Sequence, residues 1–319
     1  MNALEIKLPY LTFFHRPQRG YRWCSDAQRR VALSPVFETE VEFISLVLSV
    51  DYHPRGKGWL LTEVQIRQGG VWSPFFKLAL YSQKINHSFP PQPHAAGQVQ
   101  VDVLQAQTPA QAYRFRLTLN EEADVPGVFV CLRAAQTQPD ACAAILPLGE
   151  RKISLTPLSQ RRLAVPETDQ MRLCSPTSLT MALNAFGVPA DPLQTAAAVY
   201  DDRARIYGNW TLNTAYACRL GLQACVTRFT RLSQLDPFVN KDSLVLASIA
   251  YQRGELTGAA VPRTPGHLVV VCGWQEGQVW VADPAAEQTR QVLRRYPAEE
   301  FARAWLLNKR GAAYLVRKK

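Results

Sequence analysis

Four side chains in the second half of this 319-residue chain have the types that amide cleavage through a thioester requires: Gln170, Cys174, His267 and Asp283. In such chemistry a thiolate attacks the carbonyl carbon, an imidazole accepts and returns a proton, and a carboxylate holds the imidazole in one tautomer. An amide group can donate to the oxyanion that forms. His267 is the only histidine in this half, so any imidazole chemistry there depends on it.

Cys174 stands where a helix is expected to begin. Residues 175–186 have Pro176 near the start and Gly187 just past the end, which are common start and stop signals of a helix. A thiol at a helix N-terminus faces the positive end of the helix dipole and exposed N–H groups, and both favour the thiolate. The pattern therefore predicts a reactive cysteine at position 174, with the amide of Gln170 four residues upstream.

His267 and Asp283 are expected to meet across a hairpin. His267 opens an apolar run over residues 267–272, and Asp283 directly follows a second run over residues 278–282. In an antiparallel pair, the start of one strand lies beside the end of the next. We therefore expect the carboxylate beside the imidazole, where it would fix the tautomer and support an imidazolium.

The remaining cysteines are expected to be ordinary. The chain has seven cysteines, an odd number, and no C-x-x-C spacing, so neither complete disulfide pairing nor a structural zinc site is expected. We expect no metal ligands and no cofactor. Cys218, Cys225 and Cys272 are predicted to be small buried hydrophobic groups.

Composition and charge exclude several classes of protein. Hydrophobic residues make up 47% of the chain, which is too apolar for a disordered protein, and the longest apolar stretch is too short to span a membrane. Glu5 stands where a signal peptide would be basic, so we expect a cytoplasmic location, or secretion if a leader has been removed. The net charge is +10, but the basic residues are scattered and carry no nucleic-acid motif. We expect no nucleic-acid partner.

The chain is expected to be α+β, with two domains covering residues 1–150 and 151–319. Short alternating runs predict an antiparallel β-sandwich over about residues 35–135, and the polar segment 149–166 is expected to be a linker. Asp201 and Asp202 are expected at a solvated helix end. The second domain is expected to place helices first and an antiparallel sheet after them. Its predicted helices are 175–186, 193–200, 212–220 and 297–306, and its predicted strands are 244–249, 267–272, 278–282 and 312–316.

Several motifs of the second half resemble segments of bacterial cysteine peptidases of family thirty-nine, the bacteriocin-processing type with a papain-like fold. The first spans residues 165–181 and includes Cys174-Ser-Pro-Thr-Ser; others are 208–216, 254–256, 266–271, 281–285 and 296–305. The first half resembles more loosely the β-sandwich that precedes this domain in some relatives, notably at residues 72–76.

The resemblance implies a papain-like cysteine peptidase domain with four catalytic residues. Cys174 would be the nucleophile, His267 the general base and acid, Asp283 its orienting partner and Gln170 the oxyanion donor. Family members usually have more residues between the glutamine and the cysteine, so Thr168 or Asp169 are alternatives to Gln170. The same resemblance makes residues 208–216 a candidate substrate-binding segment, with Trp210, Asn213 and Tyr216 as the side chains; core packing is the alternative for Trp210 and Tyr216.

Three functions follow from these residues. The first is hydrolysis of a peptide or a peptide crosslink through a thioester acyl-enzyme. The second is acyl transfer, in which an amine instead of water resolves the same thioester. The third is a non-catalytic glycan-binding or cell-wall-binding protein, in which aromatic side chains of the first domain form the binding platform. The candidate aromatic residues are Trp59, Trp72, Phe75 and Phe76.

Overall fold

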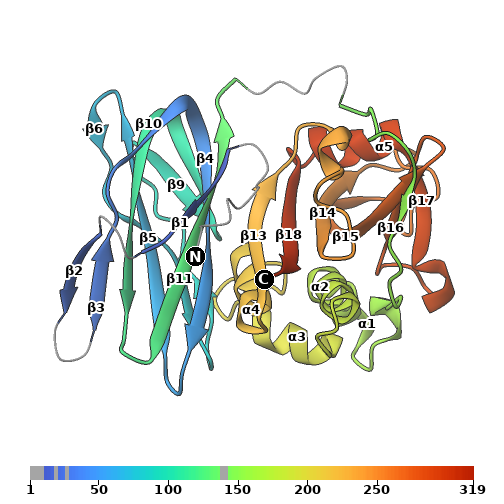
Figure 1. The fold of residues 1–319 in the computed structure, drawn as a ribbon, viewed down its shortest axis with the longest axis horizontal. Helices are drawn as coiled ribbons and strands as arrows, with labels where there is room; N and C mark the ends of the chain where they lie inside the picture. Colours follow the sequence, from blue (N-terminus) through green and yellow to red (C-terminus); the bar gives the residue numbers. More distant parts are fainter. Residues whose placement is uncertain (1–10, 18–20, 26–28, 137–142) are drawn as a thin grey trace. The chain divides into compact units, whose positions relative to one another are not determined.

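The computed structural model describes residues 11–17, 21–25, 29–136 and 143–319, which form two compact units (Figure 1). Unit 1 comprises Met1–Thr137 together with the short segment Asp201–Arg205. Unit 2 comprises Gln138–Tyr200 and Ile206–Lys319.

Unit 1 is built from antiparallel strands that form one continuous hydrogen-bonded network. The main path of this network runs in the order β1-β11-β4-β10-β5-β7-β8. The strands are β1 (Thr12–His15), β2 (Arg22–Ser25), β3 (Arg30–Leu33), β4 (Phe37–Pro54), β5 (Trp59–Gln68), β6 (Val71–Trp72), β7 (Phe76–Ser82), β8 (His87–Ser88), β9 (Gly97–Gln100), β10 (Val103–Leu119) and β11 (Ala123–Ala134).

The network folds into a sandwich because β10 changes partners along its length. Its first residues pair with β4 and β9, and its last eight pair with β5, with an irregularity between Gln105 and Ala110. Strands β4 and β7 are not paired, yet the rings of Tyr52 and Tyr81 lie 5.8 Å apart between them. These contacts confirm the predicted antiparallel sandwich.

The segment Asp201–Arg205 corrects one prediction. Asp201 is fully buried instead of solvated. Its carboxylate accepts hydrogen bonds from the backbone N–H groups of Ser88, Arg203 and Ala204. The pattern of two adjacent acidic residues after a helix gave no sign of this, because the N–H group of Ser88 is 113 residues away in the sequence.

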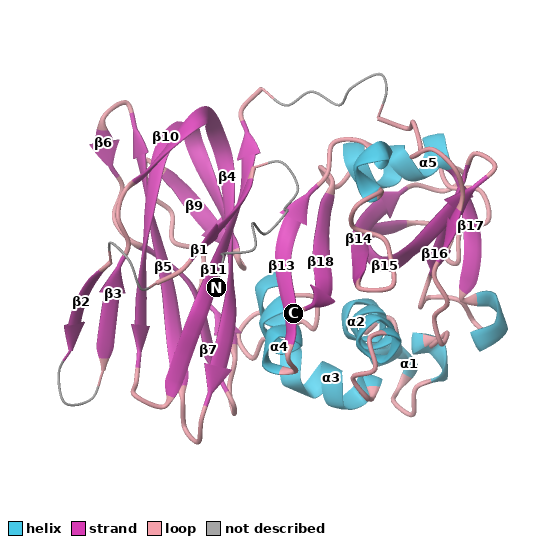
Figure 2. Cartoon of the chain, viewed as in Figure 1, coloured by secondary structure: helices cyan, strands magenta, loops and turns pink. Residues whose placement is uncertain are grey.

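Unit 2 places its helices first and most of its strands after them, as expected (Figure 2). The helices are α1 (Glu167–Gln170), α2 (Cys174–Ala185), α3 (Pro192–Val199), α4 (Trp210–Arg219) and α5 (Ala298–Ala302), with 3-10 turns at Gln160–Arg162, Leu232–Leu235 and Thr289–Gln291 and a π turn at Arg303–Leu307. The strands are β12 (Arg151–Lys152), β13 (Leu222–Arg228), β14 (Ser243–Tyr251), β15 (Thr264–Gln275), β16 (Gln278–Ala282), β17 (Leu293–Pro297) and β18 (Ala312–Lys318).

The antiparallel sheet of unit 2 has the order β13-β18-β14-β15-β16-β17. Helix α2 packs against β15, and nine of its twelve residues are buried. The segment 149–166, expected to be a linker, is instead part of this fold. Strand β12 pairs with β15, and Ser159 and Gln160 are buried.

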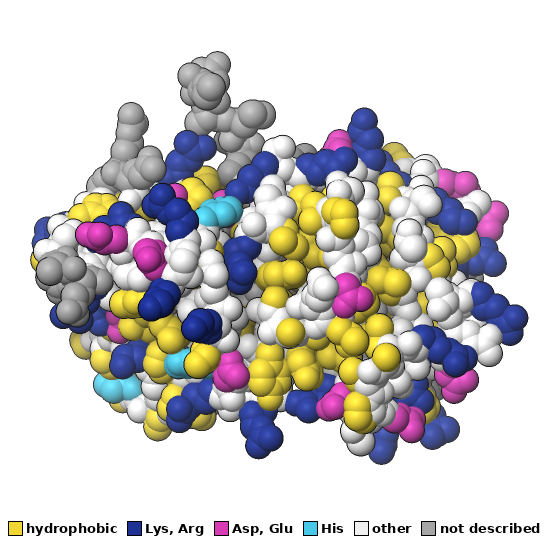
Figure 3. Space-filling view, turned by 90° about the horizontal axis from the view of Figure 1, so that it is seen from below, with side chains coloured by type: hydrophobic (Ala, Val, Ile, Leu, Met, Phe, Trp, Pro, Cys, Tyr) yellow, Lys and Arg dark blue, Asp and Glu magenta, His cyan; other side chains and the backbone are white. Residues whose placement is uncertain are grey.

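The surface carries its charge in a scattered pattern. In Figure 3, Lys and Arg side chains are dispersed over the visible face among hydrophobic and acidic ones and form no single block. No helix of the described part of the chain is both long and apolar enough to cross a bilayer.

Candidate active site

Cys174 is the first residue of α2, and its side chain is half-buried. The helix begins here because Pro176 is accommodated in a first turn, where its missing N–H is not needed. It ends at Ala185, and Gly187, two residues further on, has a φ of +80° that suits glycine. The hydroxyl of Ser178 donates to the carbonyl of Leu268 (2.9 Å), which fixes the helix on β15 beside His267.

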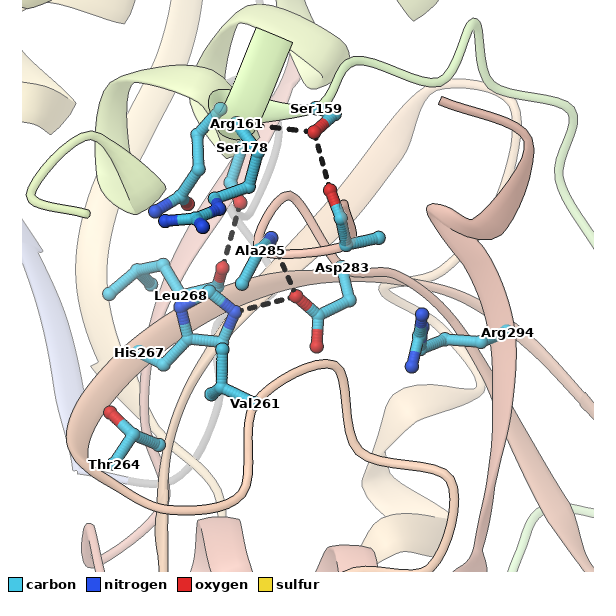
Figure 4. Close-up of polar contacts among 12 residues, drawn as sticks. Ser159, Arg161, Ser178, Val261, Thr264, His267, Leu268, Asp283, Ala285 and Arg294 are labelled. Atoms are coloured by element: carbon cyan, nitrogen blue, oxygen red, sulfur yellow. Dashed lines mark hydrogen bonds and ion pairs between the residues drawn. The ribbon is translucent and has the colours of Figure 1, made fainter. Parts of the chain in front are cut away.

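The imidazole of His267 lies between Cys174 and Asp283. His267 is 4% exposed, and its Nε2 is 2.7 Å from Oδ1 of Asp283 (Figure 4). A carboxylate only accepts, so Nε2–H donates and Nδ1 is the ring atom left for the thiol. The imidazole acts on the thiol of Cys174, since His267 lowers the pKa of that thiol.

Asp283 follows the end of β16 and is fully buried. Its Oδ1 also accepts from the backbone N–H of Ala285 (2.9 Å), and its Oδ2 accepts from the hydroxyl of Tyr296 (2.6 Å). Burial raises the pKa of the Asp283 carboxyl, but the charge and hydrogen bond of His267 and the other donors outweigh burial and lower it. The carboxyl is therefore held as a carboxylate.

The three groups support one another's charged forms. Burial lowers the pKa of His267, but the charge and hydrogen bond of Asp283, with Cys174, raise it to about 10. Burial raises the pKa of the Cys174 thiol, but the imidazolium and the backbone N–H groups of Leu268 and Ser175 lower it. The arrangement thus favours a thiolate, an imidazolium and a carboxylate in a row.

Gln170 is not brought to the thiol by its side chain. Its amide nitrogen donates to the carbonyl of Leu163 (3.0 Å) and to that of Val165 (3.2 Å), which uses both amide hydrogens. Of the alternatives, Asp169 forms a 3.6 Å ion pair with Arg172, and Thr168 is exposed.

Asn213 is fully buried and belongs to a polar network under the start of α2. Its Oδ1 accepts from Ser175 (2.9 Å), and its amide nitrogen donates to the carbonyls of Tyr207 and Asn209. The hydroxyl of Ser175 also meets that of Tyr314 (2.9 Å). Asn213 therefore anchors the residue next to Cys174. Sequence reasoning missed this anchoring role because Ser175, Asn213 and Tyr314 lie far apart in the chain.

Trp210 and Tyr216 are half-buried residues of α4. The guanidinium of Arg219 lies over the ring of Tyr216, 5.8 Å from its centre. Cys218, Cys225 and Cys272 are buried, as predicted, and burial raises the pKa of the Cys272 thiol to about 12.

The aromatic side chains proposed as a glycan platform in unit 1 have different surroundings. Phe76 is buried, and Trp59 is half-buried. The guanidinium of Arg114 lies 4.8 Å from the ring centre of Trp72, and that of Arg116 lies 4.4 Å from the ring centre of Phe75. The two half-exposed rings are thus stacked against arginine side chains.

No cluster of three potential metal-ligating side chains occurs among the described residues. A cysteine at the start of a helix, a histidine on the antiparallel sheet beneath it and an acidic partner for the histidine define the arrangement of a papain-like cysteine peptidase. Comparison with known protein families leads to the same class of protein. Residues 155–313 match the Peptidase C39 like family, and residues 25–130 match the Peptidase C39 N-terminal domain. The chain belongs to the Peptidase C39 like family and is a cysteine peptidase.

Solved structures of the same kind are distant from this chain. A double glycine motif protease from an AMS/PCAT transporter, in complex with its leader peptide, is 16% identical over 55% of this chain and 99% of its own, with a TM-score of 0.38. The peptidase domain of Streptococcus ComA is 16% identical (52% and 99%, TM-score 0.37), and a C39-like peptidase from Bacillus anthracis is 18% identical (54% and 98%, TM-score 0.40). No curated protein matches the chain.

Proposed function

We propose that Cys174, His267 and Asp283 are the catalytic triad of a peptidase that cleaves the amide bond of a peptide or a peptide crosslink. The observation that carries the proposal is the 2.7 Å contact between the buried His267 and Asp283, beside a half-buried thiol whose pKa His267 lowers. The match of residues 155–313 to a peptidase family supports the same chemistry.

The reaction would proceed in two halves. The Cys174 thiolate attacks the carbonyl carbon of the scissile amide, and an oxyanion forms on the carbonyl oxygen. His267, as the imidazolium, then gives its Nδ1 proton to the leaving amine, which leaves a thioester on Cys174. Water, deprotonated by the now neutral His267, attacks the thioester, the acid product leaves, and the thiolate and imidazolium form again.

The backbone N–H of Cys174 is one donor available to the oxyanion, because first-turn N–H groups have no partner within their own helix. Gln170 would be a second donor if its amide leaves the carbonyls of Leu163 and Val165 when substrate binds. Gln170→Ala tests this role. A loss of about 10²-fold or more in kcat with unchanged KM supports it, and an unchanged kcat removes it.

Selective alkylation tests the triad without knowledge of the substrate. An ordinary thiol is under about 1% thiolate at pH 6, so brief treatment with iodoacetamide at that pH should label Cys174 far more than the other cysteines. In His267→Ala the selectivity should be lost. Cys272→Ser is the matched control, because its thiol is buried and its pKa is raised, and it should leave labelling of Cys174 unchanged. Labelling elsewhere with Cys174 untouched would overturn the proposal.

Trapping the acyl-enzyme extends the test to the reaction. The full chain is mixed with a peptide library, quenched in acid and mapped by mass spectrometry. An acyl adduct on Cys174 that is absent from Cys174→Ala supports the thioester. Added amine distinguishes hydrolysis from acyl transfer, because only a transferase forms the new amide in preference to the acid.

A further inference from the structure

One oxygen of the Asp283 carboxylate is held by a side chain outside the triad. Oδ1 accepts from His267 and Ala285, whereas Oδ2 accepts from the hydroxyl of Tyr296 at 2.6 Å. This is a short contact for an O–H donor and a carboxylate, as expected for a charge-assisted hydrogen bond.

Tyr296 is placed by the sheet. It lies on β17, pairs with Val279 of β16 and is fully buried. Its ring stacks near that of Phe301, with 6.3 Å between the centres. His267, Asp283 and Tyr296 therefore come from three successive segments of one antiparallel sheet, β15, the end of β16 and β17. Packing holds the phenol ring in place, so its oxygen stays beside Oδ2 of Asp283.

We propose that Tyr296 is a positioning residue, which orients the Asp283 carboxylate toward His267 and keeps it ionised in its buried site. The inference rests on the triad proposed above. An unheld carboxylate could rotate about its side-chain bonds, and a buried carboxylate with fewer donors takes up a proton at higher pH. A protonated Asp283 would no longer support the imidazolium.

The other charged and titratable groups around Asp283 have different partners. The hydroxyl of Tyr251, on β14, donates to the carbonyl of Val261 (3.1 Å). The guanidinium of Arg294, on β17, donates to the carbonyls of Gln291 (3.0 Å) and Gly258. Burial, followed by the charge of Asp283, raises the pKa of both Tyr251 and Tyr296, so both phenols stay protonated and neutral. Of these two phenols, it is the hydroxyl of Tyr296 that donates to the carboxylate.

The test is the pH dependence of Cys174 alkylation in Tyr296→Phe, with Tyr251→Phe as the matched control. Each variant removes one buried phenolic hydroxyl and leaves the ring. Loss of the donor raises the pKa of Asp283, so the labelling rate of Tyr296→Phe should fall further below that of the parent as the pH falls. A hydrogen bond to a charged group is worth at least about tenfold, so the acid side of the labelling curve should move to higher pH by about one unit in Tyr296→Phe, whereas at pH 8 the two rates should agree within about twofold. Tyr251→Phe should follow the parent curve.

A double variant separates positioning from general destabilisation. In an Asp283→Asn background the carboxylate is absent, so Tyr296→Phe should add no further change to the pH profile. Melting curves show whether each variant is folded. An identical pH profile for Tyr296→Phe and the parent, or an equal shift in Tyr251→Phe, overturns the proposed role of Tyr296. A parent chain without selective labelling of Cys174 overturns the triad itself, so the two failures are distinct.

Discussion

Asp283→Asn is the substitution that most directly measures the electrostatic support for the thiolate. Asn has nearly the same shape, and its side-chain oxygen can still accept from His267 and Ala285 at the position of Oδ1. Its amide nitrogen would then face the hydroxyl of Tyr296, which can turn to accept. The variant therefore removes the negative charge and leaves most of the hydrogen-bond geometry in place.

The expected magnitude follows from the pKa of His267. Burial lowers this pKa, and Asp283 is the main group that raises it to about 10, so at pH 7 the imidazolium is favoured by about 4 kcal/mol. Without the carboxylate, burial favours the neutral ring, and Cys174 loses the cation beside it. A thiol with an ordinary pKa is about 0.3% thiolate at pH 6. Alkylation of Cys174 at pH 6 should therefore fall by about two orders of magnitude, and the difference from the parent should shrink as the pH rises.

The assay measures the rate of iodoacetamide labelling at Cys174 from pH 5 to 9 by peptide mapping. The curve should shift in one direction only, because loss of the Asp283 charge lowers the pKa of His267 and moves the labelling curve to higher pH. An Asp283→Asn curve that overlies the parent curve would refute the reasoning, since the thiolate would then need no carboxylate. In hydrolysis assays the same variant should keep a measurable remainder, because Asn still orients the ring.

Three further outcomes are expected. His267→Ala should abolish hydrolysis, measured as product release under conditions where Asp283→Asn is still active. Gly273→Ala should lower the melting temperature at least twice as much as Gly277→Ala; both have positive φ, but an added Cβ at Gly273 would collide with the backbone carbonyl of Arg151, whereas Gly277 has open space. A fragment of residues 155–319 should fold by circular dichroism and keep selective labelling of Cys174, although it lacks strand β12 and the partners that the segment Asp201–Arg205 has in unit 1.

Local patterns predicted most of the regular elements. The alternation in β10 appears as buried Tyr113, Phe115 and Leu117 with Arg114 and Arg116 between them. Helix α2 begins and ends within a residue of its predicted limits, because Pro and Gly act locally. Such features depend on residues a few positions apart, which is what a sequence displays.

The elements that were missed depend on distant partners. Strand β17 has the sequence Leu293-Arg-Arg-Tyr-Pro, which carries two adjacent cations and no clear alternation, and it becomes a strand because it pairs with β16. The segment 149–166 is polar, yet Gln160 is buried and donates to the carbonyl of Gln170. In each case tertiary contacts override a weak local preference.

In the candidate site, too, some features follow from the local sequence and others depend on residues far apart in the chain. The start signals of the helix and the predicted hairpin were enough to identify Cys174, His267 and Asp283 as candidates. The likeness to other peptidases suggested Gln170 as a donor, but its amide bonds to Leu163 and Val165, contacts that depend on how the chain folds back before α1. Tyr296 was seen only as part of a family-like motif, since an aromatic residue on a short strand gives no sign that its hydroxyl meets a carboxylate.

The contact between His267 and Asp283 depends on strand register. His267 lies near the start of β15 and Asp283 just after the end of β16, so their contact requires the observed pairing of Val270 with Ala282. A slip of one residue would turn every side chain of a strand to the opposite face of the sheet. The tight turn between Gln275 and Gln278, whose Gly277 has a φ of +75°, sets this register together with a one-residue shift between Val271 and Gly273. Open space at Gly277 should allow an alanine there to keep the register at a modest cost in stability, so Gly277→Ala should retain selective labelling of Cys174 at pH 6. Loss of that labelling in a folded Gly277→Ala chain would show that the contact between His267 and Asp283 depends on the turn, despite the open space at Gly277.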